Sequence, residues 1–262
     1  MIGIALVTEF RKLVSVKLWW ILLVVLVLYT TPVAAFLTSV VSTSTRTPLD
    51  AHSAAGQLLI YNLVPGLGYV FPLVIGAVIA TSEYSTGLAV VTFATQPWRI
   101  AVIFAKSIVA VLTGLAYGAI GSACCVIVAA PIFAQHGAVY LSDASTWWSL
   151  AGGVVAMGCW GGIGVGFGAL VRNQLVAVVV LVGFTQFVEP IVRIVVGTIS
   201  SSSDLLTHLL PAAASDALSG GSLISAAAGS GTWPQWAGAT VLAGYVVVLS
   251  VAGGLATRIR DV

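Results

Sequence analysis

The chain has 262 residues, of which 59% are hydrophobic and 7% are charged, with a formal net charge of +2. A soluble domain carries roughly 25% charged residues, so this composition excludes a soluble globular protein, and no nucleic-acid partner is expected. The apolar runs are continuous and reach the roughly 20 residues that a helix needs to cross a bilayer, whereas a membrane β-barrel has alternating segments of about ten residues. The sequence therefore predicts an all-α integral membrane protein.

The first 20 residues precede the first long apolar run. Ile2, Leu6, Phe10 and Leu13 recur at helical spacing, with charged residues elsewhere on the helical wheel. This pattern predicts an amphipathic helix over residues 2–18 that lies in the membrane interface. A basic juxtamembrane anchor is the alternative interpretation.

Six membrane-spanning helices are predicted within one transmembrane domain that covers residues 1–262. The second contains two prolines and two glycines close together, which predicts a kink or a break. The predicted spans cover approximately residues 19–41, 58–80, 103–130, 148–171, 175–197 and 236–256.

Basic residues are distributed unevenly between the two sides of these six spans. Eight of the ten Lys and Arg residues fall on the side that carries both termini, and Arg46 and Arg193 fall on the other. The positive-inside rule then predicts that both termini are cytoplasmic. The Ala-, Val- and Gly-rich composition is typical of a high-GC bacterium, so the expected location is a bacterial plasma membrane.

The fourth predicted span is crowded with glycine. Gly158, Gly162 and Gly166 follow one another at intervals of four residues, and small residues at this spacing let helix backbones approach closely. We expect a packing face here, either within the chain or between subunits.

The last external connection, residues 198–235, is long and rich in Ser, Ala and Gly. It contains the half-apolar stretch LLTHLLPAAASDAL, which is too short to cross the membrane and too apolar for a free tail. We expect it to form a re-entrant or interfacial segment on the outer side.

Ionisable residues inside a membrane are costly and therefore informative. Glu189 and Arg193 lie in the fifth predicted span and are four residues apart, so one helix face carries both and they can pair. They are either a candidate outer gate or an interfacial ion pair that ends the span. Spans one to four and span six contain no deep acid, which disfavours a proton-driven carrier.

The chain lacks the short motifs that mark common catalytic sites. It has no phosphate-binding loop, no H-E-x-x-H zinc pair and no G-x-S-x-G elbow, so no catalytic residue is expected. Cys124, Cys125 and Cys159 lie in apolar runs and lack metal-ligand spacing, so no metal site is expected either.

Residues 83–106, EYSTGLAVVTFATQPWRIAVIFAK, form the cytoplasmic connection between the second and third spans. Arg99 and Lys106 are explained as positive-inside anchors, but Glu83 adds nothing to topology. A short cytoplasmic helix with an exposed acid is suited to docking a partner protein.

This connection resembles that of the membrane subunits of type-2 ABC exporters, in which an acid, a small polar pair and a glycine precede P-x-R and a later lysine. The N-terminal TEFRKL is similar to the E-x-x-K-L segment that precedes the first span in that family. GALVRNQLVAVVV and the Leu210–Pro211 step also resemble family segments, in the same order along the chain. The residues that match in the first two segments are Glu9, Lys12, Leu13, Glu83, Gly87, Pro97, Arg99 and Lys106.

The resemblance implies a function and a set of partners. Two permease subunits, identical or paralogous, would pair in the bilayer, and each would dock a separate ABC ATP-binding subunit that holds ATP and Mg²⁺. The permease chain itself would not be an enzyme and would carry no cofactor. The docking residues implied are Glu9, Lys12, Glu83, Tyr84, Gly87, Pro97, Arg99 and Lys106.

Two other classes of function are kept as alternatives. A membrane-embedded enzyme acting on lipids or glycans would use Glu189, Arg193, Asp204 and His208, the one group of polar residues near an interface. An ion-coupled secondary transporter is the second alternative.

Overall fold

The computed structural model describes residues 2–43, 53–85, 99–136, 139–171, 173–199, 207–223, 225 and 233–259. The described part of the chain is helical and contains no β-strand. This agrees with the all-α fold class predicted from the continuous apolar runs.

Five helical segments are long and apolar enough to cross a membrane, which fits a multi-pass membrane protein. Four of them match predicted spans one, three, four and six to within a few residues: α2 (Leu18–Thr43), α7 (Arg99–Gln135), α8 (Ala144–Val171) and α14 (Gln235–Ile259). The fifth spans Gln174–Val196 and contains a short π-helix.

The second predicted span is not among these five, because it is divided into three helices. These are α3 (Ala54–Tyr61), α4 (Leu63–Leu67) and α5 (Val70–Ser85). The predicted interruption is therefore present, at Asn62 and Gly68. A sixth crossing of the membrane by this divided segment remains a prediction.

The fifth span consists of α9 (Gln174–Gly183), the π-helix η2 (Phe184–Val188) and α10 (Glu189–Ile199). A π-helical turn contains one more residue than an α-helical turn, and such turns are frequent at functional sites. The extra residue rotates everything that follows by about 100° relative to a continuous α-helix. The π-helix therefore sets the direction in which Glu189 points.

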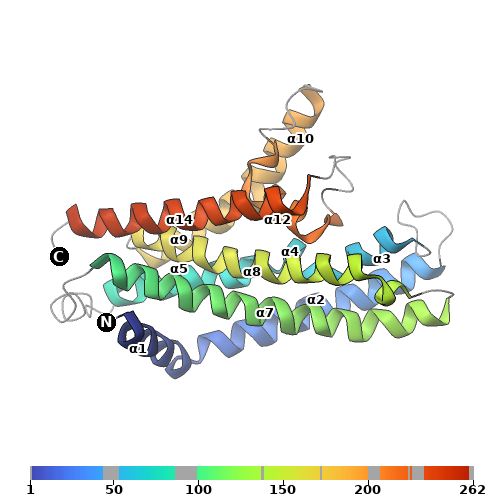
Figure 1. The fold of residues 1–262 in the computed structure, drawn as a ribbon, viewed down its shortest axis with the longest axis horizontal. Coiled ribbons are helices and arrows are strands. Elements are labelled where there is room, and N and C mark those ends of the chain that lie inside the picture. The colour runs from blue at the N-terminus through green and yellow to red at the C-terminus, as the bar shows by residue number, and fades with distance from the viewer. Residues whose placement is uncertain are drawn as a thin grey trace.

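Helix α8 occupies the centre of the bundle. It packs against α5, α7 and α14 along most of its length, and Figure 1 shows these helices running beside one another. Its glycines make this close packing possible. A Cβ added at Gly161 or Gly164 would collide with the Ala110 carbonyl oxygen of α7 or the Leu73 carbonyl oxygen of α5.

Helices α1 and α10 do not run alongside the long helices of this bundle. Helix α1 (Ile2–Ser15) packs against α7 at one end of the bundle. The last turn of α14 lies at the same end of the bundle (Figure 1). Helix α10 projects away from the bundle beside the start of α14 (Figure 1). The short 3-10 helix η1 (Tyr140–Ser142) precedes α8.

Helix α12 (Pro211–Ser219) forms from the half-apolar stretch of the last connection and packs on α8, α14 and α4. It begins with Pro211, whose missing N–H costs nothing in the first turn. It ends at Gly220, whose φ of 81° lies in the left-handed region that favours glycine. A re-entrant path for this segment remains a prediction.

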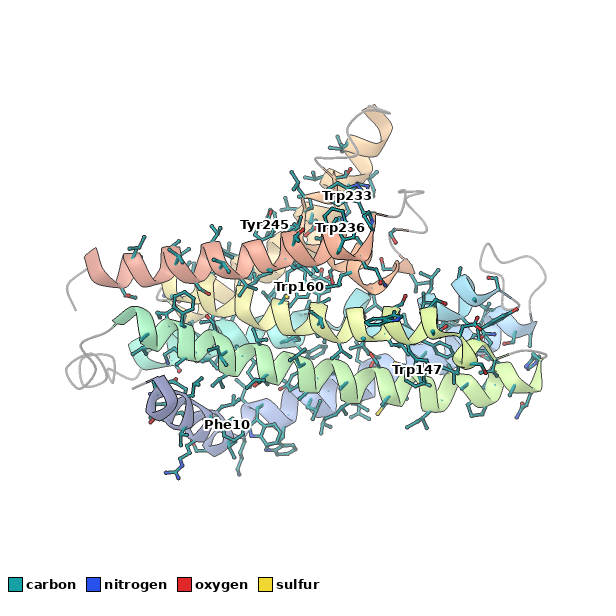
Figure 2. The ribbon with its side chains drawn as sticks, viewed as in Figure 1. Phe10, Trp147, Trp160, Trp233, Trp236 and Tyr245 are labelled. Carbon is teal, nitrogen blue, oxygen red and sulfur yellow. The ribbon has the colours of Figure 1, made fainter. Side chains whose placement is uncertain are left out.

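Tryptophans lie at the first turns of two long helices. Trp147 of α8 and Trp236 of α14 are exposed (Figure 2). Tryptophan is enriched where membrane-spanning helices meet the membrane–water interface, so these residues are consistent with the ends of the two spans.

Candidate functional site

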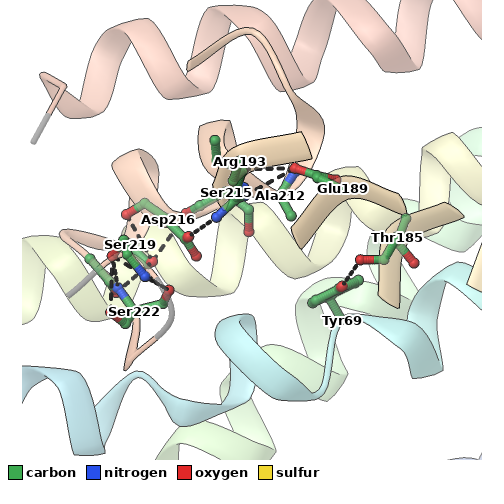
Figure 3. A network of polar contacts seen from close by, with 12 residues as sticks. Tyr69, Thr185, Glu189, Arg193, Ala212, Ser215, Asp216, Ser219 and Ser222 are labelled. Atoms are coloured by element: carbon green, nitrogen blue, oxygen red, sulfur yellow. Dashed lines mark hydrogen bonds and ion pairs between the residues drawn. The ribbon is translucent and has the colours of Figure 1, made fainter. Parts of the chain in front are cut away.

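Three charged side chains form a buried network between α10 and α12, which we call the α10–α12 cluster: Glu189, Arg193 and Asp216. Arg193 Nη2 lies 3.0 Å from Glu189 Oε1, and Arg193 Nη1 lies 2.7 Å from Asp216 Oδ2 (Figure 3). Glu189 is completely buried and Arg193 is 9% exposed. The guanidinium therefore joins two carboxylates that come from different helices.

The Glu189 carboxylate also binds the first turn of α12. Its Oε1 accepts hydrogen bonds from the backbone N–H groups of Ala212 at 2.7 Å and Ala213 at 3.1 Å. The first N–H groups of a helix have no partner within the helix, and the helix dipole favours a negative charge beside them. Glu189 thus stabilises α12 from outside and connects α10 to its first turn.

A second set of polar contacts connects the start of α5 to this region. The Tyr69 hydroxyl donates to the Thr185 carbonyl oxygen at 3.0 Å, within the π-helix (Figure 3). The Tyr69 ring stacks on Trp160 of α8, with centroids 4.6 Å apart, and Trp160 Nε1 donates to Ser215 Oγ of α12. The broken second segment is therefore held against both α8 and the π-helix.

A small cavity lies beside the α10–α12 cluster, and two of the residues that line it, Glu189 and Arg193, have an unpartnered polar atom. The free volume is about 10 Å³, which is about the space that one water molecule needs. Glu189 Oε2 and Arg193 Nε are buried and have no hydrogen-bond partner in the described part of the chain. Buried polar atoms are almost always satisfied, so this cavity has one acceptor and one donor to offer a small guest.

A second charged network, which we call the α1–α7 cluster, consists of Glu9, Lys12 and Lys106. Lys12 Nζ lies 2.7 Å from Glu9 Oε1, and Lys106 Nζ lies 2.8 Å from Glu9 Oε2. Lys106 also donates to the Ile79 carbonyl oxygen of α5 at 3.2 Å. Lys106 and Glu9 are buried, at 2% and 5% exposure, so this network joins α1 to α7 and α5.

The buried position of Glu9 defines which side of α1 lies against the rest of the protein. Phe10, which belongs to the predicted apolar face, is 54% exposed (Figure 2), and the contact of this face with the membrane interface stays a prediction. The ion pair with Lys106 holds Glu9 on the protein side of α1. An apolar groove of about 120 Å³ opens beside the cluster, with Leu13, Trp19 and Ile75 in its walls.

Mutating both partners tests the strength of the α1–α7 cluster. We expect Glu9→Gln and Lys106→Met each to lower thermal stability, because each leaves its buried partner without its counter-charge. The double variant should lose less stability than the two single variants lose together. The difference is the coupling energy, which is about 0.5–3 kcal/mol for contacting residues. Thermal unfolding, followed by a thiol-reactive dye that reports exposure of buried Cys125, measures all four proteins. Strict additivity would contradict the direct pairing.

The other residues predicted to dock a partner are only partly described. Glu83 and Tyr84 belong to the last turn of α5, and Arg99 begins α7. Gly87 and Pro97 lie outside the described residues. The docking assignment of the whole set therefore stays a prediction.

The three predicted packing glycines of α8 face neighbouring helices of the same chain. A Cβ at Gly158 would contact Leu115 of α7. Gly162 and Gly166 face α14, where a Cβ would meet Val246 and Leu249, respectively.

Of the residues of the enzyme alternative, Glu189 and Arg193 pair in the α10–α12 cluster. Asp204 lies outside the described residues, and the His208 ring stacks on Trp233 with centroids 4.8 Å apart. Among the described residues, no group of three His, Cys, Asp or Glu side chains has an arrangement that could hold a metal ion.

Asp216, Tyr69 and Trp160 are the site residues that the sequence does not single out. Asp216 lies in an external Ser- and Ala-rich segment, and nothing local indicates that this segment returns to α10. One local feature concerns Asp216: it follows Pro211 by five residues in a stretch with helical propensity. Since proline is favoured in the first turn of a helix, this spacing predicts that Asp216 lies on a helix that begins at Pro211. The chain matches no known protein-family model, and no curated protein sequence matches it.

Proposed function

We propose that the chain is the membrane subunit of an ATP-driven exporter of the type-2 ABC family. In this proposal the helical bundle forms the translocation path, and a separate ATP-binding subunit docks at the end that carries α1. The sequence resemblance of the N-terminal segment and of residues 83–106 supports the proposal. The multi-pass helical architecture is compatible with it.

The observation that carries the proposal is the attachment of α1 to both helices that flank the connection 86–98. Lys106 of α7 contacts Glu9 of α1 and the Ile79 carbonyl oxygen of α5. A force applied to α1 is therefore transmitted to α5 and α7 through a buried ion pair and not through a flexible joint. A docked subunit that changes shape with ATP needs such a mechanical connection.

The proposal assigns the chemistry of ATP to the partner. The chain has no phosphate-binding loop, so ATP and Mg²⁺ would bind the separate subunit. The permease would pair with a second copy or a paralogue in a bacterial plasma membrane, with both termini in the cytoplasm. The common location of α1 and the last turn of α14 at one end of the bundle supports this topology if α3, α4 and α5 together make the sixth crossing.

Purification from the native host tests the proposal directly. We expect a mild-detergent pull-down of the tagged chain to retain a stoichiometric partner with a phosphate-binding loop and vanadate-sensitive ATPase activity. Mass spectrometry identifies the partner, and an ATPase assay on the eluate measures its activity. A pure chain without such a partner, purified under conditions in which a known ABC complex from the same host stays intact, would refute the proposal.

A charge reversal in the proposed docking region gives a sharper test. Glu83→Arg is expected to reduce the retained ATPase subunit at least several-fold, because it places a positive charge where the partner meets an acid. Quantitative mass spectrometry of the pull-down measures retention. Asp143→Arg, near the opposite end of α7, is the matched control and should leave retention unchanged. Equal retention by both variants would refute the docking role of Glu83.

An ion-coupled carrier is the second candidate, and one observation favours it. Glu189 is a completely buried acid inside a membrane-spanning segment, and such residues commonly mark ion pathways. Transport that continues after ATP depletion and stops with an uncoupler would support the carrier. Transport that follows ATP and ignores the uncoupler would support the exporter.

A further inference from the structure

The α10–α12 cluster contains an imbalance of charge. One guanidinium faces two carboxylates, so the fully ionised cluster has a net charge of −1. Glu189 is completely buried and Asp216 is 8% exposed. A buried charge without a counter-charge is energetically costly even after relaxation, which favours the uptake of one positive charge.

The hydrogen bonds divide the two Glu189 oxygens into different roles. Oε1 receives three donors, from Arg193 and from the N–H groups of Ala212 and Ala213. Oε2 is buried and has no donor in the described structure. An ionised carboxylate would leave a charged oxygen unsatisfied there, whereas a protonated Oε2 becomes a donor and can bind a water molecule in the adjoining cavity.

We propose that the α10–α12 cluster binds one proton, at Oε2 of Glu189, and that this proton holds α10 against α12. The proton comes from bulk water and returns to it, and no other bond is made or broken. With the proton bound, the cluster is neutral and its contacts are intact. When it leaves, the cluster has a buried net charge of −1, and the water drawn in to solvate this charge loosens the packing of α10 against α12, although an ionised Glu189 still accepts hydrogen bonds from the N–H groups of Ala212 and Ala213.

Among the described residues, Arg193 is the cation that pairs with the two carboxylates of the cluster. Tyr69 faces the cavity from the start of α5, and Tyr245 approaches Glu189 from α14. Both are neutral phenols at physiological pH, and the contact from α8 is the uncharged Trp160. Burial raises the pKa of the Asp216 carboxyl group, while Arg193 and a hydrogen bond from Ser222 act in the opposite direction.

A metal ion fits this cavity less well than a proton. Hard cations such as Ca²⁺ take six or more oxygen ligands, and the cavity has the volume of about one water molecule. Among the buried carboxylate oxygens that the structure describes, Glu189 Oε2 is the one without a partner. The geometry thus favours a single hydrogen-bonded proton.

Infrared spectroscopy of the full-length chain in nanodiscs tests the proposal without any partner subunit. At pH 7 we expect the carbonyl stretch of a protonated carboxyl group, identified by its shift in D₂O. Glu189→Gln and Asp216→Asn should each abolish the band, because either substitution leaves a neutral pair of one cation and one carboxylate. Glu9→Gln, in the cluster where bases outnumber acids, is the matched control and should leave the band unchanged.

Hydrogen exchange provides a second readout. Raising the pH until the band disappears should increase exchange of the amides in α12 several-fold beyond the intrinsic pH effect, and Glu189→Gln should lack this increase. A wild-type chain without the band at pH 7, or a band that survives in both cluster variants, would overturn the proposal. So would stabilisation by Na⁺ in the absence of the band, since a metal ion would then take the place of the proton. These outcomes are independent of whether the chain docks an ATPase.

Discussion

Arg193→Gln is expected to lower the free energy of unfolding by about 3–5 kcal/mol, the typical cost of removing one partner of a buried ion pair. The substitution leaves two buried carboxyl groups from different helices without the cation that joins them. Thermal unfolding with a thiol-reactive dye, performed at one fixed pH, measures the loss. We expect α12 to detach from α10 before the remainder of the bundle unfolds.

A triple variant distinguishes the missing charge from a packing defect. Glu189→Gln, Arg193→Gln and Asp216→Asn together remove all three charges; the two acids keep their shapes, and position 193 carries the same shorter Gln as in the single variant. We expect this variant to recover more than half of the stability that Arg193→Gln loses, because replacing every member of a buried ionic network is commonly close to neutral. If the triple variant is the least stable, the charges are not the origin of the effect.

Gly164→Val is expected to cost at least about 3 kcal/mol, the upper end of the range for overpacking a well-packed interior. Gly164 lies where α8 crosses α5, and a Cβ there would collide with the Leu73 carbonyl oxygen. Because the atoms in the way belong to the backbone of α5, no side chain can move aside to make room, and α8 and α5 must separate. Expression level and thermal stability of the purified chain measure the effect.

Gly244→Val is the matched control, because it makes the same chemical change in another long helix. Nothing lies within 4 Å of a Cβ at Gly244 on α14, so the added side chain has open space. Its thermal stability should stay close to that of the wild type. Similar losses in both variants would mean that valine disfavours these helices in general and that the contact between α8 and α5 is not the cause.

Hydropathy predicts the long helices well because crossing a membrane imposes length and composition on a local stretch of sequence. The predicted bounds of the first, third, fourth and sixth spans agree with α2, α7, α8 and α14 to within a few residues. The broken segment is harder, since its average composition is that of a span while Asn62 and Gly68 interrupt its helical hydrogen bonding. Its prolines and glycines indicate the break but not the number of pieces.

The contacts of the candidate site are of two kinds: local contacts, which the sequence predicts, and contacts between distant residues, which it does not. Glu189 and Arg193 are four residues apart, so their pairing can be predicted from helical spacing alone. The third member, Asp216, is 23 residues from Arg193 in sequence, and its approach depends on how α12 packs. Glu9 and Lys106 are separated by 97 residues. Both match docking positions of the resembled family, but the sequence does not predict that they contact each other.

The length of α7 affects how the bundle sits in a bilayer. Its exposed apolar residues extend from Phe104 to Ile127, a distance of about 35 Å at 1.5 Å per residue, whereas the hydrocarbon core is about 30 Å thick. A helix relieves such a mismatch by tilting, here by about 30°, or by thickening the surrounding lipid. Because α1 is attached to α7 through Lys106, a thicker membrane that lets α7 stand upright would also turn α1 relative to the membrane surface. Membrane thickness would then adjust the orientation of the helix that faces the proposed partner.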